Sequence, residues 1–324
     1  MQALIDYGIG LTIALQTSFP WMAPVMAFLS NLGTEDFYFL ALPLLYWSID
    51  TNIGLRVGAI LITSSMVNGT AKLLFAGPRP YWVSSHVQPL WPEYSFGAPS
   101  GHAQHGLTVW GTIAAFQKKW LKIVLGALIF LIGFSRIFLG AHFLHDVILG
   151  WIIGGILLWA FLKFWSPVAA WLSNKTPREQ VILAFVVSLI FLVVGYSAAI
   201  YRSDFQIPVS WMENAARAGT ETLDPVNPAD SFSSAGVFFG LMFGLVWINS
   251  KGGFKASGPV WMRAARFIIG LVGILILWML LGEGFPRNDD AISYLLRYFR
   301  YSLVGWWISG GAPWLFARFR LIEV

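Results

Sequence analysis

Three short polar stretches interrupt a chain that is otherwise strongly apolar. Residues 72–80 read KLLFAGPRP, residues 98–106 read APSGHAQHG, and residues 135–146 read SRIFLGAHFLHD. Together they hold lysine, arginine, serine, histidine and aspartate side chains, which bind anions, attack electrophiles or transfer protons. Charged groups near a bilayer are costly and tend to mark function, so we expect the chemistry of the chain in these stretches.

The first two stretches also have ordinary structural explanations. Lys72 ends an apolar segment and Arg79 follows a Gly-Pro break, so both side chains can extend to the membrane interface as basic residues commonly do. The alternative is a pair of cations around an anion. Ser100 fits the N-cap of a helix, whose free N–H groups form a site for phosphate. His102 then lies in the first turn of that helix.

The third stretch places a histidine and a carboxylate at helical spacing. His142 and Asp146 are four residues apart, and they share one face if a helix begins there. A carboxylate behind a histidine fixes the tautomer and raises the basicity of the other ring nitrogen, as in catalytic triads. A purely structural hydrogen bond is the alternative.

Together the stretches hold the groups that phosphoryl transfer requires. Three cations and the N–H groups behind Ser100 and Gly101 suit a dianionic phosphate and its transition state. One histidine can attack phosphorus while the other protonates the leaving oxygen. Acidic clusters of the kind that hold Mg²⁺ or Zn²⁺ do not lie nearby. We therefore expect no cofactor, with Lys72, Arg79 and Arg136 acting in place of a metal.

The composition is that of a polytopic membrane protein. The 324 residues are 57% hydrophobic and 11% charged, against about 25% charged in a soluble domain. The 17 Trp and 26 Phe suit aromatic belts at two interfaces. Cysteine is absent, which excludes disulfides and thiolate chemistry. We attribute the net charge of +5 to short loops that orient helices, and not to nucleic-acid binding.

Apolar segments predict an all-α bundle of about nine spanning helices. A span needs about 20 mostly apolar residues. Residues 3–30 are apolar but interrupted by Pro20 and Pro24, so we interpret them as an amphipathic or re-entrant segment, with a tenth span as the alternative. The nine expected spans lie near residues 34–49, 52–74, 103–117, 120–139, 146–165, 180–200, 233–249, 265–283 and 294–316.

Loop charge predicts how the bundle is oriented. Basic residues gather in one set of turns, which by the positive-inside rule face the cytoplasm together with the C-terminus. The opposite loops, near 76–101, 140–145, 201–232 and 284–292, are longer and more acidic. All three polar stretches fall on that outer side. We expect a multi-pass protein of a bacterial inner membrane, divided into a catalytic core at 1–165 and a C-terminal transmembrane extension at 166–324.

The three stretches resemble the three-part motif of the type 2 phosphatidic acid phosphatase superfamily. The matching residues are Lys72-x6-Arg79-Pro80, Pro99-Ser100-Gly101-His102 and Ser135-Arg136-x5-His142-x3-Asp146. The superfamily includes lipid phosphate phosphatases, undecaprenyl pyrophosphate phosphatases, sphingosine-phosphate phosphatases, glucose-6-phosphatases and vanadium haloperoxidases. Its six-helix core would cover roughly residues 34–165.

The resemblance implies a role for each motif residue. His142 would be the nucleophile that forms a phosphohistidine, Asp146 would orient it, and His102 would be the general acid. The phosphoryl oxygens would be held by Lys72, Arg79, Ser100, Gly101 and Arg136. Ser135 and Pro99 belong to the motif as possible supports. Three histidines lie outside it: His105 and His145, which we expect to pack or support, and His86, a candidate substrate contact.

The branch of the superfamily is left open by the sequence. KLLFAGPRPYWV with GAPSGHA resembles glucose-6-phosphatases, whereas LGTEDFYFLALPLLYWSID at 32–50 resembles sphingosine-phosphate phosphatases. We expect a lipid phosphate monoester drawn from the membrane, with a sugar phosphate or a polyprenyl diphosphate as the alternative. Tyr81, Trp82 and Trp91 would form either a sugar-stacking platform or an interfacial belt. Arg297 and Arg300 would assist a headgroup or reach the interface.

A transporter, an inactive scaffold and a phosphotransferase are the rival classes of function. The oligomeric state is not predicted.

Overall fold

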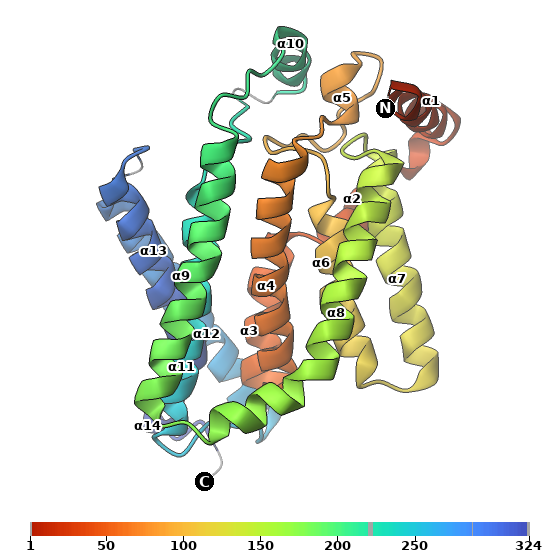
Figure 1. Cartoon of the computed structure of the whole chain (residues 1–324). Helices are drawn as coiled ribbons and strands as arrows, with labels where there is room; N and C mark the ends of the chain where they lie inside the picture. The colour runs from red at the N-terminus through yellow and green to blue at the C-terminus, as the bar shows by residue number, and fades with distance from the viewer. Residues whose placement is uncertain (1, 220–222, 287, 323–324) are drawn as a thin grey trace. The chain divides into compact units, whose positions relative to one another are not determined.

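The computed structural model describes residues 2–219, 223–286 and 288–322, and over these residues it is built of helices (Figure 1). The prediction of an all-helical, polytopic architecture is confirmed. Six helical segments are long and apolar enough to cross a membrane within the described part of the chain. They are Thr51–Val83, which joins α4 and α5, and Lys119–Phe138, Leu144–Ser173, Pro177–Tyr201, Ala229–Asn249 and Val260–Gly284.

Three of the nine expected spans form shorter helices. The span expected at 34–49 is α3 (Glu35–Leu44) followed by a π-helical turn (Leu45–Ile49). The span expected at 103–117 is α6 (Gly101–Ala115). The last is divided into α13 (Ala291–Trp306), a second π-helical turn (Trp307–Gly311) and α14 (Ala312–Arg318). All nine ranges are thus helical, but a count of nine spans remains a prediction.

The chain folds as two compact units, each formed of segments that are separated in the sequence. The first comprises residues 1–38, 67–160 and 197–227, and the second comprises 39–66, 161–196 and 228–324. The chain passes from one unit to the other within α4 (Thr51–Phe75), α8 (Leu144–Ser173) and α9 (Pro177–Tyr201). All three polar stretches belong to the first unit. The predicted division at residue 165 remains a prediction.

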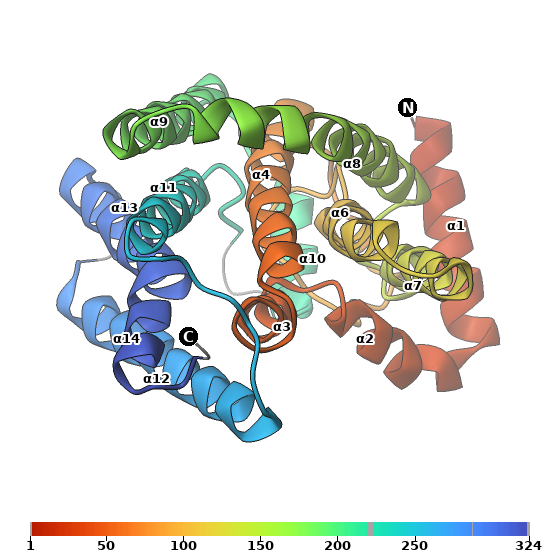
Figure 2. The same ribbon diagram turned by 90° about the horizontal axis from the view of Figure 1, so that it is seen from below.

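The N-terminal segment of the first unit is a pair of short helices. α1 (Gln2–Ser18) is followed by a single 3₁₀ turn (Pro20–Met22) and by α2 (Ala23–Asn31). Figure 2 shows α1 and α2 from the side, in the view where α6 and α7 (Lys119–Phe138) are seen end-on. The two N-terminal helices therefore run across the direction of α6 and α7. The interpretation of residues 3–30 as an amphipathic or re-entrant segment, with a tenth span as the alternative, remains a prediction.

The buried face of α1 is small and polar. Its buried residues are Gly8, Thr12 and Gln16, at helical spacing of four. Leu4 and Tyr7 are exposed on the other side. Thr12 Oγ1 donates to the carbonyl of Ile137, and Gln16 Nε2 donates to the carbonyls of Phe138 and Gln88 at 3.0 and 2.9 Å. α1 is thus attached by hydrogen bonds to the turn that carries the third polar stretch.

The second unit is held together by close helix packing. α11 (Ala229–Asn249) lies along α13, and a methyl group added at Gly236, Gly240 or Gly244 would overlap atoms of α13 or of the π-helical turn that follows it. Ser309 Oγ, in that turn, donates to the carbonyl of Leu241 at 2.8 Å. Small residues that allow backbones to approach are a common basis of packing between membrane helices. The unit also contains α12 (Val260–Gly284).

Gly240→Ala should therefore destabilise the protein, because the new methyl group overlaps the carbonyl oxygen of Ser302. Overpacking of this kind costs about 1–3 kcal/mol. Gly126→Ala on α7 is the control, since nothing lies within 4 Å of the added methyl group there. Helix propensity alone favours alanine at both positions. Equal melting temperatures of the two variants in detergent would contradict the close packing of α11 on α13.

Candidate active site

The third polar stretch turns sharply where α7 ends. Gly140, with φ of +73°, follows the last turn, and the N–H groups of Gly140 and Ala141 donate to the carbonyls of Ile137 and Arg136, both at 3.1 Å. These are the two bonds of a Schellman motif, which favours glycine at the left-handed position. The His142 N–H also donates to the carbonyl of Arg136, at 3.2 Å. The turn thereby places His142 beside Arg136.

His142 precedes α8 and does not lie on it. The helix begins at Leu144, so the expectation that His142 and Asp146 share a helical face is wrong. They still meet, because Asp146 Oδ2 reaches back to accept the N–H of Phe143 at 2.9 Å and lies 3.5 Å from His142 Nδ1. A carboxylate in the first turn that binds the backbone ahead of the helix is half of a capping box. Both side chains are buried.

Arg79 links the loop after α5 (Pro80–Val83) to the His142 turn. The side chain is fully buried, and its Nε and Nη2 donate to the carbonyls of Ser95 and Phe96 at 2.7 and 3.1 Å. Its Nη1 donates to the carbonyl of Ala141 at 3.0 Å and lies 3.3 Å from His142 Nε2. One guanidinium group therefore fixes two loops relative to each other and faces Nε2 of His142.

Glu93 lies between the two arginines, and we did not single it out from the sequence. Its Oε2 accepts from Arg79 Nη2 at 2.8 Å, and its Oε1 forms a very short ion pair with Arg136 Nη2. Oε1 also lies 4.0 Å from Nδ1 of His102. A signal was available, because Glu93 is the one acidic residue between positions 76 and 101.

The backbone of Glu93 is held by Tyr81. The Tyr81 hydroxyl donates to the Glu93 carbonyl at 2.6 Å and accepts the Glu93 N–H at 2.8 Å. Tyr81 and Trp82 are both buried, so the expectation of a stacking platform or an interfacial belt is wrong for this pair. Trp91 is half-buried, with Arg136 5.4 Å from its ring centroid and His102 in edge contact.

The second polar stretch starts α6 as predicted. Ser100 is the N-cap, and its Oγ accepts the Ala103 N–H at 3.4 Å. The Ser100 N–H donates to the backbone carbonyl of Asp146 at 3.0 Å. Asn68 Nδ2, on α4, donates to Gln104 Oε1 at 2.9 Å and to the Pro99 carbonyl at 3.4 Å. These bonds fix the start of α6, with Gly101 and His102, against α4 and α8.

Lys72 and Arg136 complete the cluster. Lys72 Nζ donates to Ser95 Oγ at 2.8 Å, and the same oxygen accepts from Arg79 Nη2 at 3.1 Å. Arg136 is fully buried, and its Nη1 donates to Ser30 Oγ on α2 at 2.6 Å. The N-terminal segment thus contributes a ligand to one of the cations. The structure therefore brings the predicted residues of all three stretches into one cluster.

Comparison with known proteins places this cluster in a family. Residues 53–170 match the model of the PAP2 superfamily, and residues 232–323 match that of the PAP2 superfamily phosphatase transmembrane extension. Phosphatidylglycerophosphatase B of Bacillus subtilis is 31% identical over 44% of this chain and 75% of its own length. The chain belongs to the PAP2 superfamily. It is a multi-pass membrane phosphatase, a phosphoric monoester hydrolase, as the resemblance of the three motifs implies.

Two further PAP2 relatives differ in how much of the chain they match. Glucose-6-phosphatase 3 of Bos taurus is 26% identical and covers 100% of this chain and 98% of its own length. Sphingosine-1-phosphate phosphatase 2 of Mus musculus is 27% identical over 68% of this chain and 57% of its own length. Relatives named for lipid and for sugar substrates are therefore similar to this phosphatase.

The remaining candidate residues of the PAP2 motifs and loops have local contacts. Ser135 Oγ donates to the Ile132 carbonyl in its own helix at 2.7 Å. His145 is half-exposed, stacks on Phe143, and its Nε2 lies 3.3 Å from Asp146 Oδ1. His105 is buried within α6, and His86 is exposed in the loop. Arg297, in the second unit, donates to Ser233 and Asp230.

The charges of the cluster control two ionisation states. Burial opposes the charge of Glu93, yet Arg79 and Arg136 hold the pKa of its carboxyl well below the usual range. Burial lowers the pKa of the His142 imidazole well below its usual value, and the two guanidinium groups lower it further. At neutral pH the phosphatase therefore combines an ionised Glu93 with a neutral His142, whose Nε2 lies 3.3 Å from Arg79 Nη1.

Glu93→Gln should destabilise the phosphatase, because two buried guanidinium groups lose their counter-charge. We expect a cost of about 3 kcal/mol, measured as a lower melting temperature in detergent. The folded pKa of Glu93 lies below its unfolded value of about 4.3, so its contribution is present above that pH and is lost as the pH falls. The difference from wild type should be constant between about pH 8 and 5 and shrink below about 4.

Asp230→Asn is the control, since it removes an exposed carboxylate paired with Arg297 and exposed pairs contribute little. If the melting temperature of Glu93→Gln at neutral pH equals that of the wild type, the two arginines do not depend on this carboxylate.

Proposed function

We propose that this phosphatase hydrolyses a phosphate monoester of a membrane lipid, on the extracytoplasmic side, through a phosphohistidine intermediate. The observation that favours a lipid is the exposure of apolar side chains that are near the charged residues in the sequence. Leu74 and Phe75, two and three residues after Lys72, are 52% and 55% exposed, and Tyr94, next to Glu93, is 58% exposed. An acyl chain fits against such a surface, whereas a free sugar phosphate gains nothing from it.

In the proposed mechanism His142 attacks phosphorus. The Nδ1–H of His142 points to Asp146, which orients the imidazole and stabilises the positive charge that forms on it, and the Nε2 lone pair is directed toward the cations. Arg79, Arg136, Lys72 and the N–H groups at the start of α6 hold the phosphoryl oxygens and stabilise the charge of the transition state. A bond forms between Nε2 and phosphorus as the bond from phosphorus to the alcohol oxygen breaks.

His102 would supply the proton for the leaving alcohol. Its Nδ1 faces Glu93 at 4.0 Å, and its Nε2 is buried without a hydrogen-bond partner among the described residues. Nε2 is therefore not engaged by the protein. In the proposed step it carries the proton that passes to the departing oxygen, and Glu93 stabilises the positive charge of His102 before the transfer. In the second step His102 takes a proton from water, which attacks phosphorus. The bond from phosphorus to His142 then breaks and inorganic phosphate leaves.

Asp146→Asn tests the role of the carboxylate behind His142. Asparagine keeps an oxygen that can accept the Phe143 N–H, so the turn should survive while the charge is lost. We expect kcat to fall by about 10⁴-fold, as for the corresponding change in a catalytic triad. The measurement is single-turnover phosphate release, with the melting temperature as the control for folding. Unchanged kcat in a folded variant would remove Asp146 from the mechanism.

Glucose 6-phosphate is the second candidate substrate. It is favoured by the similarity to glucose-6-phosphatase 3 along the whole chain, including the part beyond the motifs. The lipid-phosphate relatives match a smaller share of the chain. A polyprenyl diphosphate would use the same nucleophile and cations, with the polyprenyl monophosphate in place of an alcohol as the leaving group.

A substrate panel separates these candidates. Detergent-purified protein is given phosphatidate, sphingosine phosphate, undecaprenyl phosphate and diphosphate, or glucose 6-phosphate, with EDTA present, beside the His142→Ala variant. We expect release from a lipid monoester, no release by the variant, and an acid-labile phosphoryl label on the wild type alone. Preference for glucose 6-phosphate would overturn the lipid proposal. Activity retained by His142→Ala would overturn the mechanism.

A further inference from the structure

One segment of the first unit lies outside both family-matched regions. Residues 171–231 separate the match that ends at 170 from the one that begins at 232. Within them, residues 197–227 belong to the same compact unit as the catalytic motifs. The segment contains α10 (Val209–Arg217), which packs against α5, the short helix that follows Arg79.

Arg202 connects this segment to the end of α4. Its Nε donates to the carbonyl of Leu73 at 2.7 Å, and its Nη2 donates to the carbonyl of Leu74 at 2.5 Å. These carbonyls belong to the last turn of α4. Carbonyls at the end of a helix have no N–H partner within the helix, so they accept hydrogen bonds from other groups. Lys72 lies in the same turn, and its own carbonyl accepts the N–H of Ala76 at 2.9 Å.

The charge of Arg202 matters as well as its hydrogen bonds. The C-terminal end of a helix carries a partial negative charge, which attracts cations and disfavours anions. Here that end lies directly beside Lys72, at the site proposed for a phosphate dianion. The guanidinium of Arg202 offsets the partial charge and fixes the direction in which the last turn presents Lys72.

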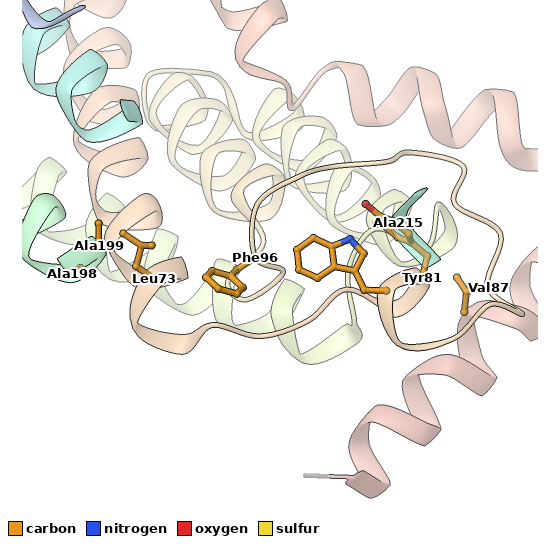
Figure 3. Close-up of a cluster of buried hydrophobic side chains, with 8 residues drawn as sticks. Leu73, Tyr81, Val87, Phe96, Ala198, Ala199 and Ala215 are labelled. Carbon is orange, nitrogen blue, oxygen red and sulfur yellow. The ribbon is translucent and has the colours of Figure 1, made fainter. Parts of the chain in front are cut away.

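A buried cluster attaches the rest of the segment to the first motif. Figure 3 shows Leu73 beside Ala198 and Ala199, and Tyr81 beside Ala215 of α10. Asn214 Nδ2 donates to the carbonyl of Trp82 at 2.9 Å. The rings of Trp82 and Trp211 lie 5.7 Å apart, and those of Phe96 and Phe205 lie 5.3 Å apart. Residues from before and after Arg79 are thus both covered by the segment.

We propose that Arg202 is a positioning residue for phosphate binding, which acts by fixing the last turn of α4 and with it Lys72. The inference rests on the proposed function for its effect on catalysis, but its structural part does not. Asn214 has a similar but smaller role at the turn after α5. The segment 197–227 therefore makes the phosphate-binding groups of the core dependent on chain that lies beyond the core.

The experiment compares Arg202→Gln with Arg202→Lys. Glutamine can donate to a carbonyl but is neutral, whereas lysine keeps the charge and can reach one of the two carbonyls. Arg263→Gln is the matched control, because Arg263 Nε also donates to a backbone carbonyl, that of Gly258, in the second unit. Two quantities are measured: steady-state kinetics on the best substrate of the panel, and hydrogen exchange of the peptide that spans residues 72–83.

We expect kcat/KM of Arg202→Gln to fall by about 10- to 100-fold, mostly through KM, since small displacements of binding groups have effects of that size. Arg202→Lys should recover part of the loss, and Arg263→Gln should behave as wild type. Exchange in the 72–83 peptide should accelerate in Arg202→Gln, with peptides of the second unit unchanged.

The two readouts separate the inference from the proposed function. Exchange does not require turnover, so unaltered exchange at 72–83 in a folded Arg202→Gln variant overturns the positioning role whatever the substrate is. Accelerated exchange with no activity of the wild type on any substrate supports the positioning role and counts against the proposed function. Accelerated exchange with unchanged KM in an active variant shows a structural role alone and overturns the inference.

Discussion

The site depends on one carboxylate shared by two buried guanidinium groups. Arg79 and Arg136 come from different segments, and both are fully removed from solvent. Two like charges in such surroundings repel and lose hydration, so they require an anion between them. Glu93 provides it from the intervening loop. The cations are thereby aligned before substrate arrives, and such preorganisation lowers the cost of binding and of reaching the transition state.

Backbone carbonyls are the main anchors of the surrounding loops. Arg79 donates to three of them, Gln16 to two and Arg202 to two. Loops that lie against an apolar bundle have backbone N–H and C=O groups that water does not reach. Long polar side chains supply the hydrogen bonds that these groups require. The same bonds fix the loops in position, so satisfying the backbone and arranging the active site are achieved by one set of contacts.

The groups proposed to act on phosphate are easier to identify from the sequence than the groups that support them. Lys72, Arg79, His102, Arg136 and His142 could be identified because their types and spacing match both a chemical requirement and a family motif. Glu93 and Gln16 belong to no motif, and their roles depend on a loop conformation that periodicity does not encode. The helical ranges were predicted from apolar content, but interruptions by π-helical turns reduced the number that is long enough to span.

The N-terminal helix has an inverted pattern, with apolar residues outside and Gly8, Thr12 and Gln16 inside. Its attachment to the core combines the hydrogen bonds of Thr12 and Gln16 with the packing of partly buried apolar side chains against clusters of the first unit. Hydrogen bonds are strongest where competing water is excluded. Solubilisation in detergent changes the surroundings of these hydrogen bonds. A small, loosely packed micelle admits water to these bonds while still covering the hydrophobic helices. We therefore expect α1 to detach before the spanning helices unfold, so that turnover is lost while the helical content and the monodispersity of the preparation are kept.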